Sequence, residues 1–347
     1  MSPTPLLLPS TDDSVIEAFM ETLSNSQVRV IGPELVFGKL YDYVGYGSIE
    51  EEMLRHLTIT RLVYPGSKLK TLYYLQRYRN VYLSSDEIYR FLDKLSSSLK
   101  ERVEEISFEH TKRSLGGDLS LVFYDMTTLY FEAEDEDDIR RRGFSKDGKH
   151  QNPQIFIGLL VGKDGFPIGY DIFEGNTFEG HTLLPMISKL KSKFNLSQPV
   201  IIADAGLLSK NNISDLKKLG YEFILGGRIK NESSSLREKI LSKKWEKDGT
   251  IHSFEKQDGT RLIVSYSDSR SSNDLKNRKR GLARLEKAVA TGKLNKSNIN
   301  NRGYNRYLTM RGNIEIEINY DKFENDRKWD GLKGYITNSS LSHDQII

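Results

Sequence analysis

Apolar residues recur at helical spacing through the first third of the chain. One series lies within residues 54–62 and a second within residues 88–99. A Pro-Gly pair at 65–66 ends the first series, and a Gly-Gly pair at 116–117 follows the second. The pattern predicts a helical domain over residues 1–117.

This helical region carries several basic residues. They are Arg55, Arg61, Lys68, Lys70, Arg77 and Arg79. Basic residues on a small helical domain are typical of a DNA-binding module. A plain helical bundle with a solvated basic surface accounts for the same pattern.

After Gly117 the spacing of apolar residues becomes that of β-strands. The expected strands cover residues 119–125, 154–161, 166–173, 199–204 and 221–225. Helices are expected at 182–194 and 209–219, and residues 163–165 predict a hairpin turn. Because such apolar strands need helices on both faces, the pattern predicts an α/β domain over residues 118–227.

Residues 228–330 mix strand-like stretches with a charged helical stretch at 273–291. The strand-like stretches cover residues 251–254, 261–266, 304–310 and 314–319. We interpret this region as an inserted β-rich lobe that is not part of the first sheet. Residues 331–347 then return towards the α/β core.

Composition narrows the chemistry available to this chain of 347 residues. It contains no cysteine, which excludes disulfides, thiolate metal sites and a cysteine nucleophile. A metal site would therefore use carboxylates or the six histidines. No apolar run approaches the roughly 18 residues that a membrane span requires, and the first ten residues lack the features of a signal peptide. We expect a cytoplasmic protein that does not associate with membranes.

The near balance of 51 Lys and Arg against 48 Asp and Glu hides a segregation of charge. Residues 228–311 hold 21 basic residues and only 9 acidic ones. Such a surplus is compatible with a polyanionic partner, because neutralising phosphates supplies most of the sequence-independent affinity for nucleic acid. A solvated lysine-rich surface explains it equally well.

Two aspartates, Asp125 and Asp204, each stand at the end of an apolar strand. In an open sheet, ligands bind at the carboxyl ends of the strands. If the two strands are neighbours, the carboxylates converge, and Mg²⁺ is the cation that suits one or two carboxylates together with waters or phosphate oxygens. Either aspartate alone is more often a turn or capping residue.

Four stretches of the core closely resemble DDE transposases of bacterial and archaeal insertion sequences. They read YDMTTLYFE from Tyr124, RRGFSKDGKHQNPQIFIGLLV from Arg141, FPIGYDIFEGNTFEGHTL from Phe166 and IIADAGLLSKNNI from Ile201. The branch they match best is the insertion-sequence-four group with an inserted β-domain. The N-terminal stretches LRHLTITRLVYPGSKLKTLYYL and DEIYRFLDKL resemble the leader domain of the same family.

The resemblance implies an RNase H-like core with Asp125 and Asp204 as the first two catalytic acids. It also implies two Mg²⁺ ions, cleavage and joining of double-stranded DNA at terminal inverted repeats, insertion into target DNA, and a homodimer that pairs two ends. The family's third acid is a glutamate on a helix after the insertion. The stretch KWDGLKGYITNSSLSHDQII resembles the segment just before that helix, so we expect this chain to lack the glutamate.

Two alternatives stay open. The chain is either a transposase or a catalytically inactive protein that binds DNA ends and inhibits an intact transposase. An RNase H-like nuclease unrelated to transposition would leave the N-terminal match unexplained.

Basic residues in two places are candidates for DNA contact. They are Arg141, Arg142, Lys146, Lys149, Arg228 and Lys230. The first four follow an acidic run at 132–138, so pairing with that run on a solvated loop is the competing explanation.

Overall fold

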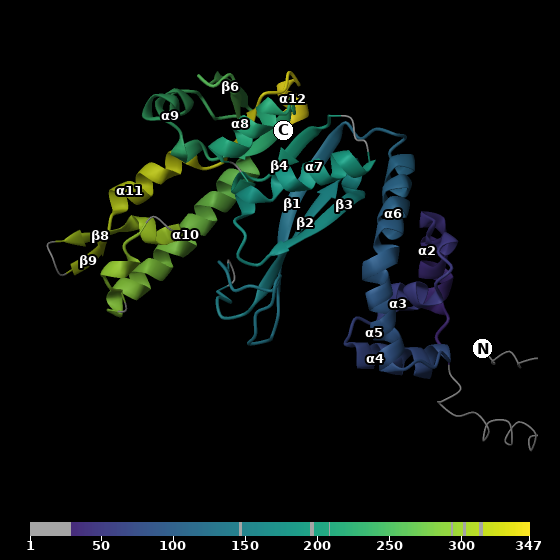
Figure 1. Ribbon diagram of the computed structural model, residues 1–347. Helices are drawn as coiled ribbons and strands as arrows, with labels where there is room; N and C mark the ends of the chain where they lie inside the picture. The colour runs from purple at the N-terminus through teal and green to yellow at the C-terminus, as the bar shows by residue number, and fades with distance from the viewer. Residues whose placement is uncertain are drawn as a thin grey trace, which may run out of the picture. The chain divides into compact units, whose positions relative to one another are not determined.

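The computed structural model describes residues 29–145, 148–194, 198–207, 209–292, 294–300, 303–311 and 315–347 (Figure 1). The chain divides into two compact units, Met1–Gly116 and Gly117–Ile347. Gly116 and Gly117 have φ angles of 61° and 86°, in the left-handed region that glycine adopts without strain.

The first unit is helical, as its sequence predicts. Its elements are η2 (Glu34–Gly38), α2 (Lys39–Val44), η3 (Tyr46–Ser48), α3 (Glu52–Val63), α4 (Lys68–Tyr74), η4 (Leu75–Arg79), α5 (Ser85–Lys94), η5 (Leu95–Leu99) and α6 (Lys100–Ser114). Tyr41, Leu54 and Phe91 form the centre of a small core. A capping box between Ser84 and Glu87 begins α5.

The second unit is built on an eight-stranded sheet in the order β3-β2-β1-β4-β5-β10-β7-β6. The strands are β1 (Leu121–Tyr130), β2 (Gln154–Val161), β3 (Pro167–Glu174), β4 (Val200–Ala203), β5 (Phe223–Gly227), β6 (Ile251–Glu255), β7 (Arg261–Tyr266) and β10 (Leu332–Thr337). Strands β1, β4 and β5 are parallel, and the other neighbouring pairs are antiparallel. The first five strands have the order and directions of an RNase H-like fold, which confirms the predicted class.

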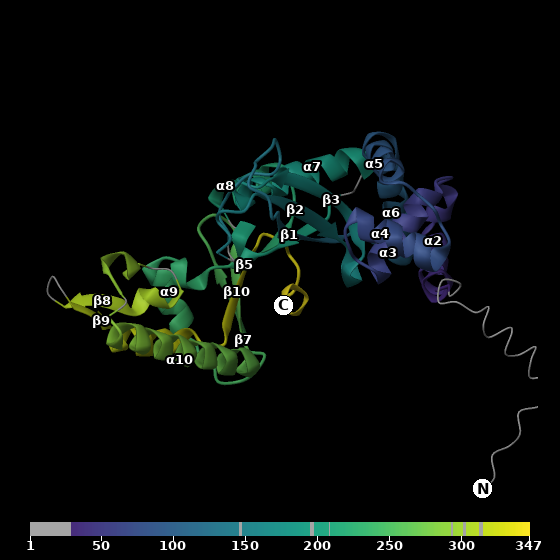
Figure 2. The same cartoon turned by 90° about the horizontal axis from the view of Figure 1, so that it is seen from below.

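Helices cover one face of this sheet more completely than the other. Helices α7 (Leu183–Phe194) and α8 (Lys210–Lys218) lie on one side, and the short α12 (His343–Ile346) lies on the opposite side (Figure 2). Ile346 of α12 packs in a cluster with Ile224 and Ile263. The expectation that helices cover both faces is wrong over β1–β3, where Phe123, Leu159 and Ile172 remain 39%, 42% and 43% exposed.

The insertion differs from the expected separate lobe. Strands β6 and β7 extend the main sheet through β10, because β7 pairs with β10 along its whole length. The remainder has its own core of Leu285, Tyr307, Leu308 and Phe323. It comprises α9 (Ser234–Leu241), α10 (Asp268–Ala290), η10 (Lys296–Asn298), η11 (Gly303–Tyr307), the hairpin of β8 (Leu308–Arg311) and β9 (Glu315–Ile318), α11 (Tyr320–Asn325) and η12 (Asp326–Trp329).

Candidate metal and DNA site

The sheet brings Asp125 and Asp204 side by side. Strands β1 and β4 are parallel neighbours, and Tyr124 lies opposite Ala203. Each aspartate directly follows one of these paired residues, so the two Cα atoms are separated by about the spacing of adjacent strands, roughly 5 Å. Tyr124 and Ala203 are buried whereas both aspartates are exposed. Both aspartates are therefore accessible next to the same buried pair of residues.

Backbone donors orient both carboxylates. The Met126 N–H donates to Asp125 Oδ1 over 2.8 Å, and the Gly206 N–H donates to Asp204 Oδ1 over 2.9 Å. Two neighbouring carboxylates supply the hard oxygen ligands that suit Mg²⁺ when water or phosphate completes its coordination. Within the described part of the chain, no group of three or more His, Asp or Glu side chains is placed to hold a metal ion. The donor set that fits a cation here is thus the aspartate pair.

The buried side chain of Tyr124 fixes the segment that flanks this pair. Its hydroxyl donates to Thr182 Oγ1 over 2.9 Å, and Thr182 in turn donates to the Glu179 carbonyl oxygen over 2.8 Å. Burial raises the pKa of Tyr124 to about 12, so this hydroxyl keeps its proton. The contact ties η7 (Glu179–His181) to the strand that carries Asp125.

Sequence reasoning missed Glu179 as a site residue. The turn η8 (Ala205–Leu207) follows Asp204 and contacts η7. A Cβ placed on Gly206 would lie 2.9 Å from Glu179 Oε2, so this carboxylate lies against the turn that holds Asp204. In the sequence, Glu179 lies in the quoted stretch that begins at Phe166 and in an acidic, glycine-rich run at 174–180, which is equally typical of an ordinary turn.

The predicted basic residues between β1 and β2 differ in how far their side chains are engaged within this loop. Arg141 forms a backbone bridge with Gln154. Arg142 Nε donates to the Gln151 carbonyl oxygen over 3.0 Å, and its Nη2 donates to the Glu134 carbonyl oxygen over 2.5 Å. Lys149 is exposed with its ammonium over the Tyr130 ring. Lys146 lies outside the described residues.

The acidic run before these residues also forms local pairs. The Arg140 backbone N–H and guanidinium both donate to the Asp137 carboxylate, over 2.6 Å in each case, and lower the pKa of Asp137 to about 2. The Glu136 carboxylate accepts the backbone N–H of Arg142. Arg140 therefore pairs with the acidic run through its side chain, and Arg142 contacts the run through its backbone N–H.

Arg228 and Lys230 lie instead at a pocket of about 600 Å³. Its charged lining residues are Arg228, Lys230, Arg270, Arg278, Arg306, Lys333, Asp274, Asp326 and Asp330. Two aromatic residues, Tyr304 and Trp329, also line it. The pocket begins at Gly227, where β5 ends beside β4, so it lies at the same sheet edge as Asp204.

Ion pairs shape the floor of this pocket. Lys230 and Arg306 both contact Asp326, over 3.1 and 2.6 Å. Burial lowers the pKa of Lys230, and Asp326 opposes that shift. Burial alone would raise the pKa of Asp326, but the Tyr307 hydroxyl and the two cations outweigh it and lower the pKa. With six cations against three carboxylates among these lining residues, the pocket favours an anion.

No known family model and no curated protein matches this chain. Among solved structures, it is similar to a piggyBac transposase synaptic complex with hairpin DNA, at 12% identity and a TM-score of 0.30 over 54% of this chain and 38% of that one. It is also similar to a Mos1 transposase paired-end complex with the left transposon end, at 10% identity and a TM-score of 0.22 over 61% of this chain and 72% of that one. Similarities of this size carry no argument about function.

Of the described helices, none has the length and apolar character needed to cross a membrane.

Proposed function

We propose that this chain is an insertion-sequence transposase whose RNase H-like sheet holds Mg²⁺ at Asp125 and Asp204. One observation carries the proposal: the two aspartates follow a directly paired position on adjacent parallel strands. The resemblance of the surrounding motifs to DDE transposases supports the same reading. It also motivates the remaining parts of the proposal, namely binding of terminal inverted repeats, capture of target DNA and a homodimeric synaptic complex.

The residues of the proposed site account for the binding of cations and the positioning of a phosphodiester more directly than for proton transfer. Asp125 and Asp204 would hold the cations, which when bound stabilise the developing charge on the attacking and leaving oxygens of a phosphodiester. In the reaction implied by the resemblance, a water oxygen bonds to phosphorus and the 3′-oxygen leaves. The freed 3′-hydroxyl later attacks a target phosphodiester in the same way. Because phosphoryl transfer depends mainly on positioning, the backbone bonds to both carboxylates matter.

DNA would reach this position from the basic side of the insertion. Arg228 and Lys230 lie in the cationic pocket at the same edge of the sheet, so we assign them to the phosphate backbone next to the cleaved bond. We keep Lys149 as a further phosphate contact because it is exposed. We also propose phosphate contacts for Arg141, Arg142 and Lys146, which lie near Lys149 in the sequence.

The alternative is a protein that binds DNA ends without cleaving them. The observation that favours it is the pair of carboxylates where the family uses three acids, since the described residues contain no third acid placed to complete a metal-binding group. In this reading the chain occupies the same DNA and competes with an active transposase.

A nicking assay separates the two functions. The substrate is labelled duplex DNA from the regions that flank the gene for this chain, incubated with Mg²⁺ or with a chelator. We expect Mg²⁺-dependent nicks from the unaltered chain, and a loss of roughly 100-fold or more in Asp125→Asn and Asp204→Asn, the order of effect expected when a reacting group is misplaced. The matched control is Glu174→Gln, which removes an exposed carboxylate on β3.

Retention of nicking in both aspartate variants would contradict the proposed site. If the unaltered chain binds the flanking DNA in a salt-sensitive manner but never nicks it, the end-binding alternative is correct and the catalytic proposal is wrong.

A further inference from the structure

Helices α3 and α4 form a helix-turn-helix in the first unit. Four residues, Tyr64 to Ser67, separate the end of α3 from the start of α4, and Gly66 stands among them. Arg61 of α3 donates through Nη1 to the Gly66 carbonyl oxygen over 3.1 Å. Ser67 caps α4 by accepting the Lys70 N–H over 3.3 Å. A turn of this length containing glycine is typical of the motif.

The second helix presents a buried face and an exposed face. Its α-helical part ends at Tyr74 with helical φ and ψ at Leu75, so η4 continues the segment to Arg79. Thr71, Tyr74 and Leu75 are buried. The exposed positions are Leu69, Lys70, Tyr73 and Gln76. Successive positions in this set are one, three and three residues apart, which places the four side chains on one face of a helix.

The charge of this region is one-sided. Residues 53–85 contain six basic residues and no acidic residue. A surface made from such a span attracts anionic partners and repels basic ones, and the phosphate backbone of DNA has the complementary charge. Leu69 and Tyr73, which are 70% and 56% exposed, lie among the polar positions instead of forming a continuous apolar patch.

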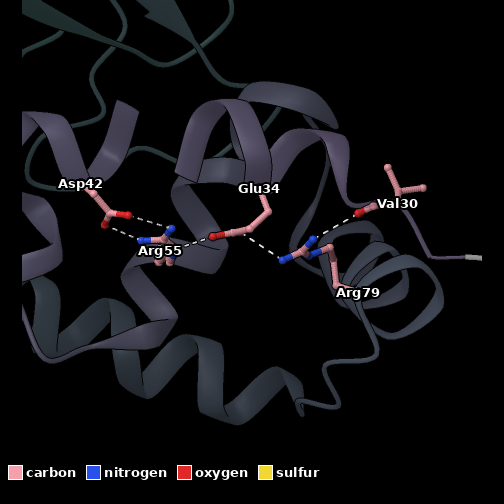
Figure 3. Close-up of polar contacts among 5 residues, drawn as sticks. All are labelled: Val30, Glu34, Asp42, Arg55 and Arg79. Carbon is pink, nitrogen blue, oxygen red and sulfur yellow. Dashed lines mark hydrogen bonds and ion pairs between the residues drawn. The ribbon is translucent and has the colours of Figure 1, made fainter. Parts of the chain in front are cut away.

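Two of the six cations form ion pairs inside the unit, and they hold the motif together (Figure 3). Arg55 on α3 contacts Glu34 over 2.5 Å and Asp42 over 2.7 Å. Arg79 at the end of η4 contacts the same Glu34 over 3.0 Å and donates to the Val30 carbonyl oxygen over 3.1 Å. Glu34 therefore links the first helix of the motif to the end of the second. These arginines position the motif, although the sequence alone offered them as DNA contacts.

We propose that α4 is a recognition helix that enters the major groove of duplex DNA, with Lys70, Tyr73 and Gln76 facing the base edges. Glutamine pairs with the N6 and N7 positions of adenine and lysine with the O6 and N7 of guanine, while an apolar side chain such as Leu69 contacts a thymine methyl group. Lys68, in the first turn, faces the phosphates. This inference rests on the proposed function for the identity of the DNA, which is the end of the element, and is independent of catalysis at Asp125.

The test measures the affinity of the full chain for duplex fragments that flank its gene and for unrelated duplex of equal length, each across a range of salt concentrations. Lys70→Ala and Gln76→Ala each remove one side chain that faces bases. We expect each to weaken binding to the flanking fragment about 10-fold, the order of loss for one base contact, and to leave binding to unrelated duplex within about threefold. Lys112→Ala, an exposed lysine on α6 of the same unit, is the matched control and should change neither affinity.

Further variants keep the result interpretable. Circular dichroism checks that the helical unit remains folded, and Arg55→Ala, which breaks the internal network, should lower thermal stability as well as binding. If Lys70→Ala and Gln76→Ala bind the flanking fragment as tightly as the unaltered chain, α4 does not read DNA and the inference is overturned, whatever the nicking assay gives. If they lose specific binding while the unaltered chain shows no nicking, the inference stands and the catalytic proposal fails.

Discussion

At the scale of single residues, the candidate site depends on glycines as much as on carboxylates. Gly206 leaves room for the Glu179 carboxylate beside the turn that holds Asp204. Gly158 on β2 leaves room for the Tyr124 ring, since a Cβ there would lie 2.4 Å from the tyrosine oxygen. Tyr124 precedes Asp125 directly, so both glycines permit side chains that shape the surroundings of the aspartate pair.

Substituting these two glycines by alanine should have different effects. In Gly206→Ala the new methyl group meets the end of a flexible glutamate, which can move aside, so we expect the free energy of unfolding to change by less than about 1 kcal/mol. In Gly158→Ala it meets a buried ring held by a hydrogen bond, and the expected loss is about 1–3 kcal/mol. Denaturant titration measures both.

A second pair of variants tests whether Glu179 supports the site. If it does, Gly206→Ala and Glu179→Gln should each lower Mg²⁺-dependent nicking by roughly 10-fold, the order of effect of groups that orient metal ligands. Unchanged nicking in Glu179→Gln would assign this residue to the turn alone.

At the scale of elements, one buried ion pair joins helix α10 to the residues just before strand β10. Arg278 on α10 is 5% exposed and donates through Nη1 to Asp330 Oδ1 over 2.5 Å. Asp330 immediately precedes Gly331 and β10. Burial raises the pKa of Asp330, and Arg278 opposes that rise. The pair lines the cationic pocket, so the stability of the insertion and the form of the pocket are coupled.

Removing Arg278 should therefore be costly. Arg278→Ala leaves a buried carboxylate without this partner, and we expect a loss of about 3–5 kcal/mol in the free energy of unfolding. Arg280→Ala is the control on the same helix, because Arg280 is exposed and should change stability by no more than about 0.5 kcal/mol. Thermal and urea unfolding of both variants provide the measurement, and equal stability of the two would contradict a coupling through this pair.

At the scale of the whole molecule, the chain consists of two units with separate cores. Leu115 is partly exposed and Gly116, Gly117 and Asp118 are exposed, so little side-chain packing restrains the junction. Basic residues are concentrated in the helix-turn-helix of the first unit and in the insertion of the second. This distribution fits a protein that contacts DNA through both units.

Limited proteolysis tests the independence of the two units. Among sites in the described part of the chain, we expect a protease of low specificity to cut first between residues 115 and 118, because exposed junctions with small residues are cleaved before packed elements. N-terminal sequencing and mass spectrometry of the fragments identify the position. Earlier cuts within the sheet of the second unit would show that the junction is the more protected region.

Most strands of the sheet were predictable because each is a short apolar run bounded by turn residues. Strand β2 covers the expected residues 154–161, β4 falls within its expected range, and β5 begins and ends two residues later than the expected 221–225. Strand β1 extends five residues beyond Asp125 because it continues to pair with β2 as far as Tyr130. The membership of β6 and β7 in the main sheet was not predictable, since pairing with β10 joins residues about 70 positions apart along the chain and leaves no local signal.

By itself, the sequence located most strands and helices, and it placed Asp125 and Asp204 directly after short apolar runs. These properties depend on local spacing and on near neighbours. Only the tertiary structure decided that the two strands are adjacent, that Glu179 reaches the turn after Asp204, and that Arg55 and Arg79 act inside their unit while Lys70 and Gln76 face outward. Those outcomes depend on which distant segments pack together, because burial and pairing are set by the whole fold.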